Sequence, residues 1–343
     1  MQSDIKPSRA RRGSRGRKGN KRANATGLQQ IAWQVPKNTD TPIAPLPPEG
    51  VAAIHHTAMR ILEEVGVEFL NLEAVDTLRQ AGCTILNETR DGALVKMDRT
   101  LVMDKLAHAP EKFSITPRNL DRQIIIGGQH MVFGSIASPP NCADLERGRR
   151  PGDRQSHQDL VKLSQFFNCI HFIGGYPVEP VDSHASVRHL DCLHDQLTLS
   201  DKVVHAYSLG AGRVNDVIEM VRIAGGLTEQ EFAQTPRMFT NINSTSPLKH
   251  DFPMLDGLMR LSRCGQPTIV TPFTLAGAMS PITLAGTVAQ SIAEALCAIV
   301  LIQIINPGCP CAIGTFSTNV DMKTGAPAFG TPEYMRATQM TGQ

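Results

Sequence analysis

The chain has 343 residues, of which 41% are hydrophobic, so it can bury the core of one large domain or of two ordinary ones. The formal net charge of +2 is unevenly spread, because residues 8–22 are dense in Lys and Arg and contain no acid. Without that stretch the chain is mildly acidic, which argues against a nucleic-acid-binding surface on the folded part.

The N-terminal residues 1–48 are rich in Arg, Gly, Asn and Pro and cannot bury enough apolar surface to fold alone. We predict a disordered basic tail there, without the apolar segment of a secretory signal. Further along, the most apolar stretch, 282–305, is interrupted by Gln290, Glu294 and Gln303, which favours a buried helix over a membrane span. The eight cysteines are scattered through apolar segments, as is typical of buried thiols in a cytoplasmic protein.

Residues 49–120 predict a small mixed module. A helix is expected over 50–66, where apolar residues follow the helical period and a glycine ends the pattern. Shorter helices at 73–80 and 100–108 and extended pieces at 94–97 and 113–116 complete the module.

A partial barrel or sheet is predicted over 121–343. Residues 123–136 are expected to form two strands joined by Gly-Gly-Gln. Strands and helices then alternate at the spacing of βα units, which requires parallel pairing. The strands are expected at 169–175, 202–210, 237–243, 268–273 and 311–317, and the helices at 154–167, 185–199, 214–224, 252–264 and 284–305.

Two architectures fit this alternation, a doubly wound sheet and a closed barrel. The segment LGAGRVN (209–215) lacks the third glycine of a dinucleotide-binding turn, so such a site is not expected. Polar residues recur at the carboxyl ends of several strands, as a barrel active site requires. Only five clear strand units are present, so the chain is either an incomplete barrel or an open sheet.

Metal sites are not expected. His184, His189 and His194 are five residues apart, which turns successive side chains by about 140° on a helix, so they do not share one face. Cys309 and Cys311 form a C-x-C pair without a second pair nearby. Neither a G-x-S-x-G elbow nor a phosphate-binding loop is present.

Several long strings carry a family resemblance. They are IHHTAMRILEEVGVEF (54–69), IIIGGQHMVFG (124–134), DLERGRRPGDRQSHQDLVKLSQFFNCIHFIGG (144–175) and STNVDMKTGAPAFGTPE (317–333). In this order they resemble the trimethylamine methyltransferase family of corrinoid-dependent amine and betaine methyltransferases. The resemblance extends from residue 11 to the end of the chain.

The resemblance implies an α/β fold, a (β/α)8 TIM barrel that is incomplete at its C-terminus. Family members are longer, and their remaining barrel units would follow Gln343, as would the pyrrolysine of the amine-specific members. The implied activity moves a methyl group from trimethylamine, or from a quaternary amine such as glycine betaine, to the cobalt of a corrinoid protein. The corrinoid belongs to that partner protein, so no cofactor is expected on this chain. Membrane and nucleic-acid partners are not expected, and a homo-oligomer is left open.

Such a site holds an onium cation, which aromatic faces bind well. Candidate aromatic residues at the predicted strand ends are Tyr176, Tyr207, Phe239, Phe273 and Phe316, with core packing as the alternative role.

Polar candidates follow the same strand ends. Asp321 is the candidate partner of the cation, with a turn or helix-cap role as the alternative. His205 either faces inward beside Tyr207 or is an ordinary core histidine. The remaining candidates could bind a substrate carboxylate or cap helices, and they are Asn241, Asn243, Ser244, Thr271, Ser317 and Asn319.

Two other functions compete with this hypothesis. A lyase or aldolase needs a lysine at a strand end, whereas Lys202 precedes its strand. A non-catalytic fragment that binds methylated amines is the second alternative.

Overall fold

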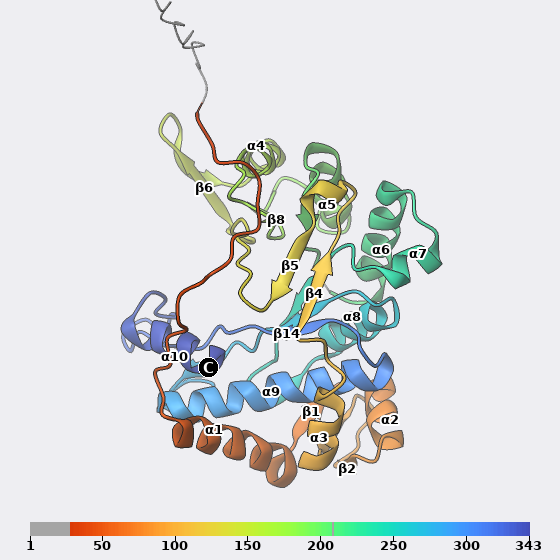
Figure 1. Cartoon of the computed structure of the whole chain (residues 1–343), viewed down its shortest axis with the longest axis vertical. Helices are drawn as coiled ribbons and strands as arrows, with labels where there is room; N and C mark the ends of the chain where they lie inside the picture. Colours follow the sequence, from red (N-terminus) through yellow and green to blue (C-terminus); the bar gives the residue numbers. More distant parts are fainter. Residues whose placement is uncertain (1–27, 208) are drawn as a thin grey trace, which may run out of the picture.

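A long apolar helix, α9 (Leu284–Ile305), lies at the centre of the largest hydrophobic core (Figure 1). The computed structural model describes residues 28–207 and 209–343. Within these residues α9 is the one helix long and apolar enough to cross a membrane, yet 83% of its most apolar window is buried inside the protein. The predicted buried helix is therefore confirmed.

The N-terminal helices pack against α9. They are α1 (Pro48–Arg60), which continues into the π-helical turn η1 (Ile61–Val65), α2 (Leu72–Gln80) and α3 (Arg99–Leu106). Strands β1 (Val67–Phe69), β2 (Thr84–Leu86) and β3 (Ala93–Lys96) form an antiparallel sheet, to which β11 (Lys249–His250) adds in parallel beside β1. Residues 49–120 thus share a core and a sheet with later segments, and the division into domains stays a prediction.

The hairpin predicted over 123–136 is wrong. Strand β5 (Ile124–Gly127) pairs instead with the earlier β4 (Lys112–Ile115), across the 3-10 turn η2 (Leu120–Arg122). Gly127 and Gly128 have positive φ angles of 101° and 60°, a conformation that glycine adopts readily, and the chain turns away from β5 there. Gly134 then bridges Phe172 in parallel.

The predicted parallel alternation is confirmed. Starting from the bridge at Gly134, five strands pair in parallel in the order in which they occur in the sequence. The strands in this order are β8 (Phe172–Ile173), β9 (Val203–Val204), β10 (Thr240–Ile242), β12 (Thr268–Val270) and β14 (Cys311–Ile313). The described strands do not close into a barrel.

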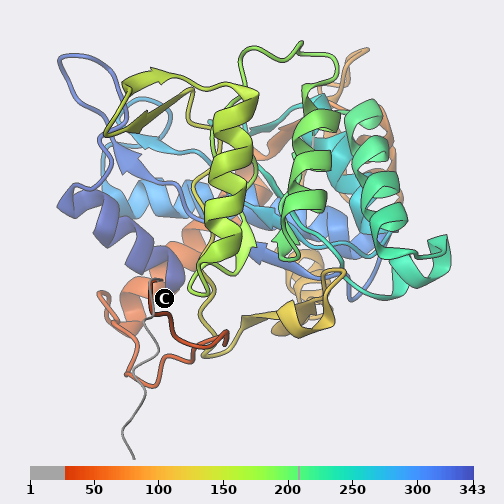
Figure 2. The same ribbon diagram turned by 90° about the horizontal axis from the view of Figure 1, so that it is seen from above.

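The connecting helices follow the same order. They are α4 (Arg154–Phe166), α5 (Arg188–Leu199), α6 (Ala211–Gly225) and α8 (Phe252–Arg263). Each packs on the next, from α4 to α5, α6, α8 and finally α9. Figure 2 shows α4, α5 and α6 side by side. A doubly wound sheet reverses its strand order at a switch point, whereas this succession advances in one direction.

Several short elements were not predicted. Strands β6 (Asn141–Asp144) and β7 (Gly148–Pro151) form a hairpin, and β13 (Leu275–Ala276) pairs in parallel with β15 (Thr318–Asn319). Helix α7 (Glu229–Gln234) begins with a capping box between Thr228 and Glu231, and α10 (Pro332–Gly342) packs against α9.

The segment 28–47, which we call the N-terminal strap, lies against the body of the protein, although the sequence predicted it as disordered. The Trp33 ring centroid is 5.1 Å from that of His171, and the Arg122 guanidinium lies 4.5 Å from the Trp33 ring centroid. The Nε2 atom of His171 contacts the Gln34 carbonyl at 2.9 Å. Residues 1–27 of the predicted tail lie outside the described residues.

Candidate functional site

A cavity of about 600 Å³ opens at the carboxyl ends of β9, β10, β12 and β14. We call it the strand-end cavity. Because the carboxyl ends of sequential parallel strands meet at one edge, side chains that follow different strands converge there. The lining residues are Ala137, Ser138, His205, Tyr207, Leu209, Asn241, Asn243, Ser244, Thr245, Ser246, Met254, Thr271, Phe273, Met279 and Phe316.

The strand-end cavity brings together most of the predicted site residues. Tyr176 lies next to it, with its ring 4.8 Å from the Tyr207 ring. Phe239 packs in the core against His205. The predicted residues that line the cavity are His205, Tyr207, Asn241, Asn243, Ser244, Thr271, Phe273 and Phe316.

Three predicted residues lie elsewhere. Ser317 is fully buried and shares a hydrogen bond with Thr274. Asn319 lies in β15 and accepts a hydrogen bond from Thr331. Asp321 is exposed in a turn, where its carboxylate accepts hydrogen bonds from the following backbone N–H groups, at 2.7 Å in the case of Lys323. Asp321 therefore has the turn role that was its alternative.

Aromatic rings form two walls of the cavity. Tyr207 meets the Tyr176 ring at 74° and the His205 ring at 83°, and its hydroxyl is hydrogen-bonded to Ser138. Burial raises the pKa of Tyr207, so its phenol stays neutral. Phe273 and Phe316 form the second wall, with ring centroids 5.2 Å apart. Neutral aromatic faces of this kind attract an onium cation.

His205 contributes a neutral ring to the cavity. It is buried, and its Nε2 atom accepts a hydrogen bond of 3.1 Å from the backbone N–H of Asn241. Burial lowers the pKa of His205 to about 4, so the imidazole carries no charge at neutral pH. The proton consequently sits on Nδ1, which has no hydrogen-bond partner among residues 28–207 and 209–343. A neutral imidazole does not repel a cationic ligand.

A buried carboxylate lies directly behind the cavity wall. Ser244 and Ser246, which line the cavity, both donate hydrogen bonds to Glu294 of α9. The Leu248 N–H and the Gln290 amide donate two more, at 2.8 Å and 2.9 Å. No Lys or Arg pairs with Glu294 in the part of the chain that the structure describes. A buried carboxylate satisfied only by neutral donors leaves a negative potential at the cavity.

The role of Glu294 escaped the sequence analysis, although a signal was present. In the sequence, Glu294 is an acid within an otherwise apolar helix, and on its own this pattern indicates only that the helix is not a membrane span. The side chain is fully buried, and burial of an acid without a counter-ion is costly. An isolated acid in an apolar helix is therefore a useful marker of a site.

A smaller pocket of about 150 Å³ adjoins the strand-end cavity and shares Ser138, Tyr207 and Leu209 with it. We call it the side pocket. It holds two arginines. Arg188 pairs with Glu179 at 2.6 Å, and Arg213 projects from the first turn of α6.

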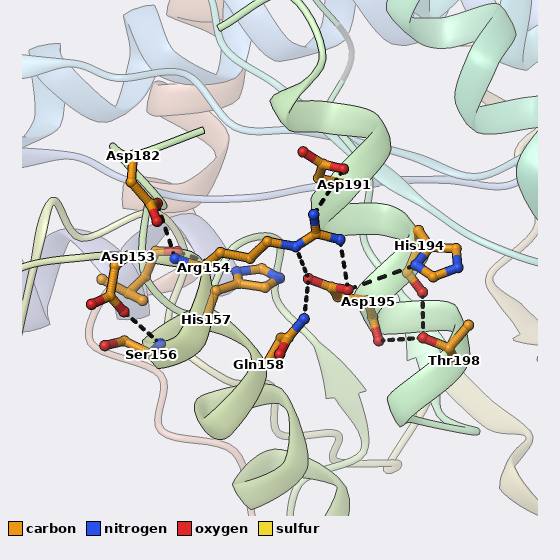
Figure 3. A network of polar contacts seen from close by, with 11 residues as sticks. Asp153, Arg154, Ser156, His157, Gln158, Asp182, Asp191, His194, Asp195 and Thr198 are labelled. Carbon is orange, nitrogen blue, oxygen red and sulfur yellow. Dashed lines mark hydrogen bonds and ion pairs between the residues drawn. The ribbon is translucent and has the colours of Figure 1, made fainter. Parts of the chain in front are cut away.

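A polar network fixes α5, one wall of the side pocket, to α4 (Figure 3). Arg154 of α4 donates to both carboxylate oxygens of Asp195, at 3.0 Å and 3.2 Å, and pairs with Asp191 at 3.1 Å. Gln158 donates a further bond to Asp195 at 3.1 Å. Bidentate pairing of this type restricts the geometry of both helices.

Other chemistries find less support at this end of the sheet. Within the described residues no three His, Cys, Asp or Glu side chains converge as metal ligands. Lys202 lies at the amino end of β9, the end away from the cavity, and donates to the Ser164 and Phe167 carbonyls at 2.6 Å and 2.7 Å. Burial lowers its pKa to about 8, but it does not line the strand-end cavity.

The relatives that the chain matches include betaine methyltransferases and trimethylamine methyltransferases. The chain is 35% identical over 283 residues to a glycine betaine methyltransferase of Desulfitobacterium hafniense, covering 82% of this chain and 58% of the relative. It is 27% identical over 298 residues to a proline betaine:corrinoid methyltransferase of Eubacterium limosum, covering 82% and 58%. A trimethylamine methyltransferase of Desulfitobacterium hafniense is 27% identical over 288 residues, covering 83% and 57%. The chain thus spans less than two thirds of the length of these relatives.

Among solved structures, a phospho-2-dehydro-3-deoxyheptonate aldolase from Thermotoga maritima matches 76% of this chain and 67% of its own, at 12% identity. Its TM-score of 0.28 is too low to assign a fold. The family model described as trimethylamine methyltransferase (MTTB) matches residues 11–343. With this match over nearly the whole chain, and with the similarity to the glycine betaine methyltransferase, the chain belongs to the trimethylamine methyltransferase (MTTB) family.

Proposed function

We propose that this chain moves a methyl group from a methylated amine to the cobalt of a corrinoid protein in the cytoplasm. Family membership supports the reaction class, and the names of the relatives include both betaine and trimethylamine methyltransferases. The observation that carries the proposal is the strand-end cavity, where aromatic walls enclose a space suited to an onium ion and the buried Glu294 lies behind Ser244 and Ser246.

We also infer that the parallel strands belong to a (β/α)8 barrel. Support comes from the order of pairing, because β8, β9, β10, β12 and β14 lie side by side in parallel in the order in which they occur in the sequence. The helices pack in the same order, and the cavity lies at the carboxyl ends of the strands, where barrel enzymes hold their sites.

A quaternary amine fits the described lining better than a tertiary one. When a methyl group leaves a quaternary ammonium, the electron pair of the broken carbon–nitrogen bond stays on nitrogen and a neutral amine departs. No proton is needed for that step. His205 has a pKa of about 4, and the pKa of Tyr207 is raised, so neither side chain is a good acid at neutral pH.

The chain's own residues would bind and orient the donor. Tyr207, Phe273 and Phe316 offer faces to the cation, and the carboxylate of Glu294 offsets its charge from behind Ser244. The corrinoid of the partner protein supplies the cobalt nucleophile that accepts the methyl group.

The test is methyl transfer in a reconstituted system. The complete protein is mixed with its corrinoid partner in the reduced state, and glycine betaine, choline or trimethylamine is added. We expect the absorption spectrum to change from that of reduced cobalt to that of methylcobalt with a quaternary donor. No spectral change with any of the donors would contradict the proposal, and binding without transfer would favour a methylated-amine-binding protein.

A further inference from the structure

Arg213 is a half-buried cation without a carboxylate partner in the part of the chain that the structure describes. It lies in the first turn of α6 and lines the side pocket. Among the described residues, the Arg213 guanidinium donates a hydrogen bond to the Ala185 carbonyl, at the long distance of 3.4 Å. By contrast, Arg188 in the same pocket pairs with Glu179, and Arg154 nearby is held by two aspartates (Figure 3).

Other features of the side pocket also suit an anion. The carboxylates at this pocket are already paired, Glu179 with Arg188 at 2.6 Å and Asp216 with the Nε2 atom of the pocket residue His189 at 2.8 Å. Helix α6 begins after Gly210, which has no side chain to cap the first N–H groups of the helix. The N-terminus of a helix carries partial positive charge, which adds to that of Arg213.

The side pocket and the strand-end cavity meet at Ser138, Tyr207 and Leu209. A small molecule can therefore occupy both spaces. The two ends of this combined space differ in charge, because Glu294 lies behind Ser244 and Ser246 of the strand-end cavity, while Arg213 lines the side pocket. A ligand with a cation at one end and an anion at the other matches this polarity.

We propose that Arg213 binds the carboxylate of a zwitterionic betaine whose onium group occupies the strand-end cavity. The inference rests on the proposed function and narrows its substrate to amines that carry a carboxylate. A guanidinium binds a carboxylate through two parallel N–H···O bonds, which fixes the orientation of the onium group as well as the affinity. Simple amines such as trimethylamine lack the group that Arg213 would recognise.

Calorimetric titration of the purified protein with glycine betaine and with choline tests this assignment. Choline carries the same trimethylammonium group but a hydroxyl in place of the carboxylate. We expect Arg213→Gln to weaken glycine betaine binding by about tenfold or more, and to change choline binding by less than about threefold. Arg213→Lys keeps the positive charge but lacks the two parallel N–H donors of the guanidinium. Its glycine betaine affinity should therefore lie between those of the unmodified protein and Arg213→Gln. Arg222→Gln, at a half-buried position of the same helix that lines neither space, is the matched control and should change neither affinity.

Equal weakening of both ligands by Arg213→Gln, or unchanged glycine betaine affinity, would overturn the assignment. Circular dichroism of each variant separates a folding defect from a loss of contact, and Arg213→Lys provides the second measurement. Because the titration needs no corrinoid partner, its outcome is separate from that of methyl transfer. Undiminished methyl transfer from glycine betaine by Arg213→Gln would reject the role of Arg213 and leave the reaction class intact.

Discussion

At the scale of single residues, the strand-end cavity combines neutral side chains at its surface with a buried negative charge behind them. His205 and Tyr207 are both held neutral by burial, while Glu294 is satisfied by hydroxyl, amide and backbone donors. A site of this type attracts a cation without offering it a proton. A quaternary ammonium donor needs this combination, because its amine leaves without being protonated.

The pKa of His205 predicts a pH-dependent stability. Its folded-state value of about 4 lies below the ordinary 6.5, so between these values the unfolded chain binds a proton that the folded chain does not. The free energy of unfolding should therefore fall as the pH decreases through this window, by about 1.4 kcal/mol per pH unit from this group.

His205→Gln, which retains an acceptor for the Asn241 N–H, tests this expectation. Urea unfolding at pH 7 and pH 5 should show that the stability advantage of the unmodified protein over the variant shrinks at the lower pH. Burial also lowers the pKa values of His157 and His250, but these groups are present in both proteins and cancel in the difference. A constant difference between the two pH values would contradict the assignment.

Glu294→Gln removes the buried charge while keeping the size of the side chain. One oxygen acceptor becomes an N–H donor that faces the donors Ser244, Ser246 and Leu248, so we expect a loss of about 1–3 kcal/mol in the free energy of unfolding. Choline should also bind more weakly, because the negative potential at the cavity is lost. Denaturant unfolding and calorimetry measure the two effects.

The matched control is Ser246→Ala, which removes one donor and leaves the charge in place. We expect it to lower the free energy of unfolding by about 1 kcal/mol and to weaken choline binding less than Glu294→Gln does. If Glu294→Gln bound choline as tightly as the unmodified protein does, Glu294 would have only a structural role.

Much of the site could be predicted at the residue scale, because polar and aromatic residues at strand ends converge whatever the details of the fold. Asn241 and Phe273 are examples, since each needed only a correct strand position to be placed at the cavity. Glu294 and Arg213 could not be placed in this way. Both lie on helices, and their roles depend on which partners surround them in three dimensions.

At the scale of elements, the periodic helices and buried strands were predictable because each repeats a simple apolar pattern. The short strands β11, β13 and β15 were not, since two residues carry no periodicity. The partner of β5 was mispredicted for a related reason. A turn signal at Gly127 and Gly128 marks a change of direction but does not specify which strand lies alongside.

Close approach of β12 and β14 predicts a sensitive glycine. A Cβ atom on Gly314, directly after β14, would lie 2.1 Å from the Oγ1 atom of Thr271, the residue directly after β12. Gly314 also donates its N–H to the Val270 carbonyl at 2.8 Å, which holds the backbone in place. We expect Gly314→Ala to lower the free energy of unfolding by about 1–3 kcal/mol and to disturb the cavity wall at Thr271.

Gly212→Ala serves as its control, because no heavy atom lies within 4 Å of a Cβ at that position in the first turn of α6. This variant should be unchanged or more stable by up to about 1 kcal/mol, since alanine restricts the unfolded chain. Thermal unfolding of both variants gives the comparison, and equal stabilities would show that β14 can move away from β12.

At the scale of the whole molecule, residues far apart in the sequence are joined at both ends of the parallel strands. The carboxyl ends form the strand-end cavity, and the N-terminal strap covers the other end near Lys202, whose ammonium lies 5.6 Å from the Trp33 ring centroid. The composition of the strap predicted disorder, because its few apolar residues cannot form a core of their own. Trp33, Val35 and Leu46 are instead half-buried against the rest of the chain, Trp33 beside His171 and Arg122.

The strap can be followed directly, because Trp33 is the single tryptophan in the sequence. If the strap is part of the cooperative fold, tryptophan fluorescence and far-ultraviolet circular dichroism should report the same urea midpoint. Trp33→Ala should then lower the free energy of unfolding by about 1–3 kcal/mol. This is less than the same substitution costs at a fully buried tryptophan, because the Trp33 ring is half-buried. Ile31→Ala, at an exposed position of the same strap, should lower the free energy of unfolding by less than about 0.5 kcal/mol. A fluorescence transition that precedes the circular dichroism transition would show that the strap detaches independently, so that the amino ends of the strands are stable without it.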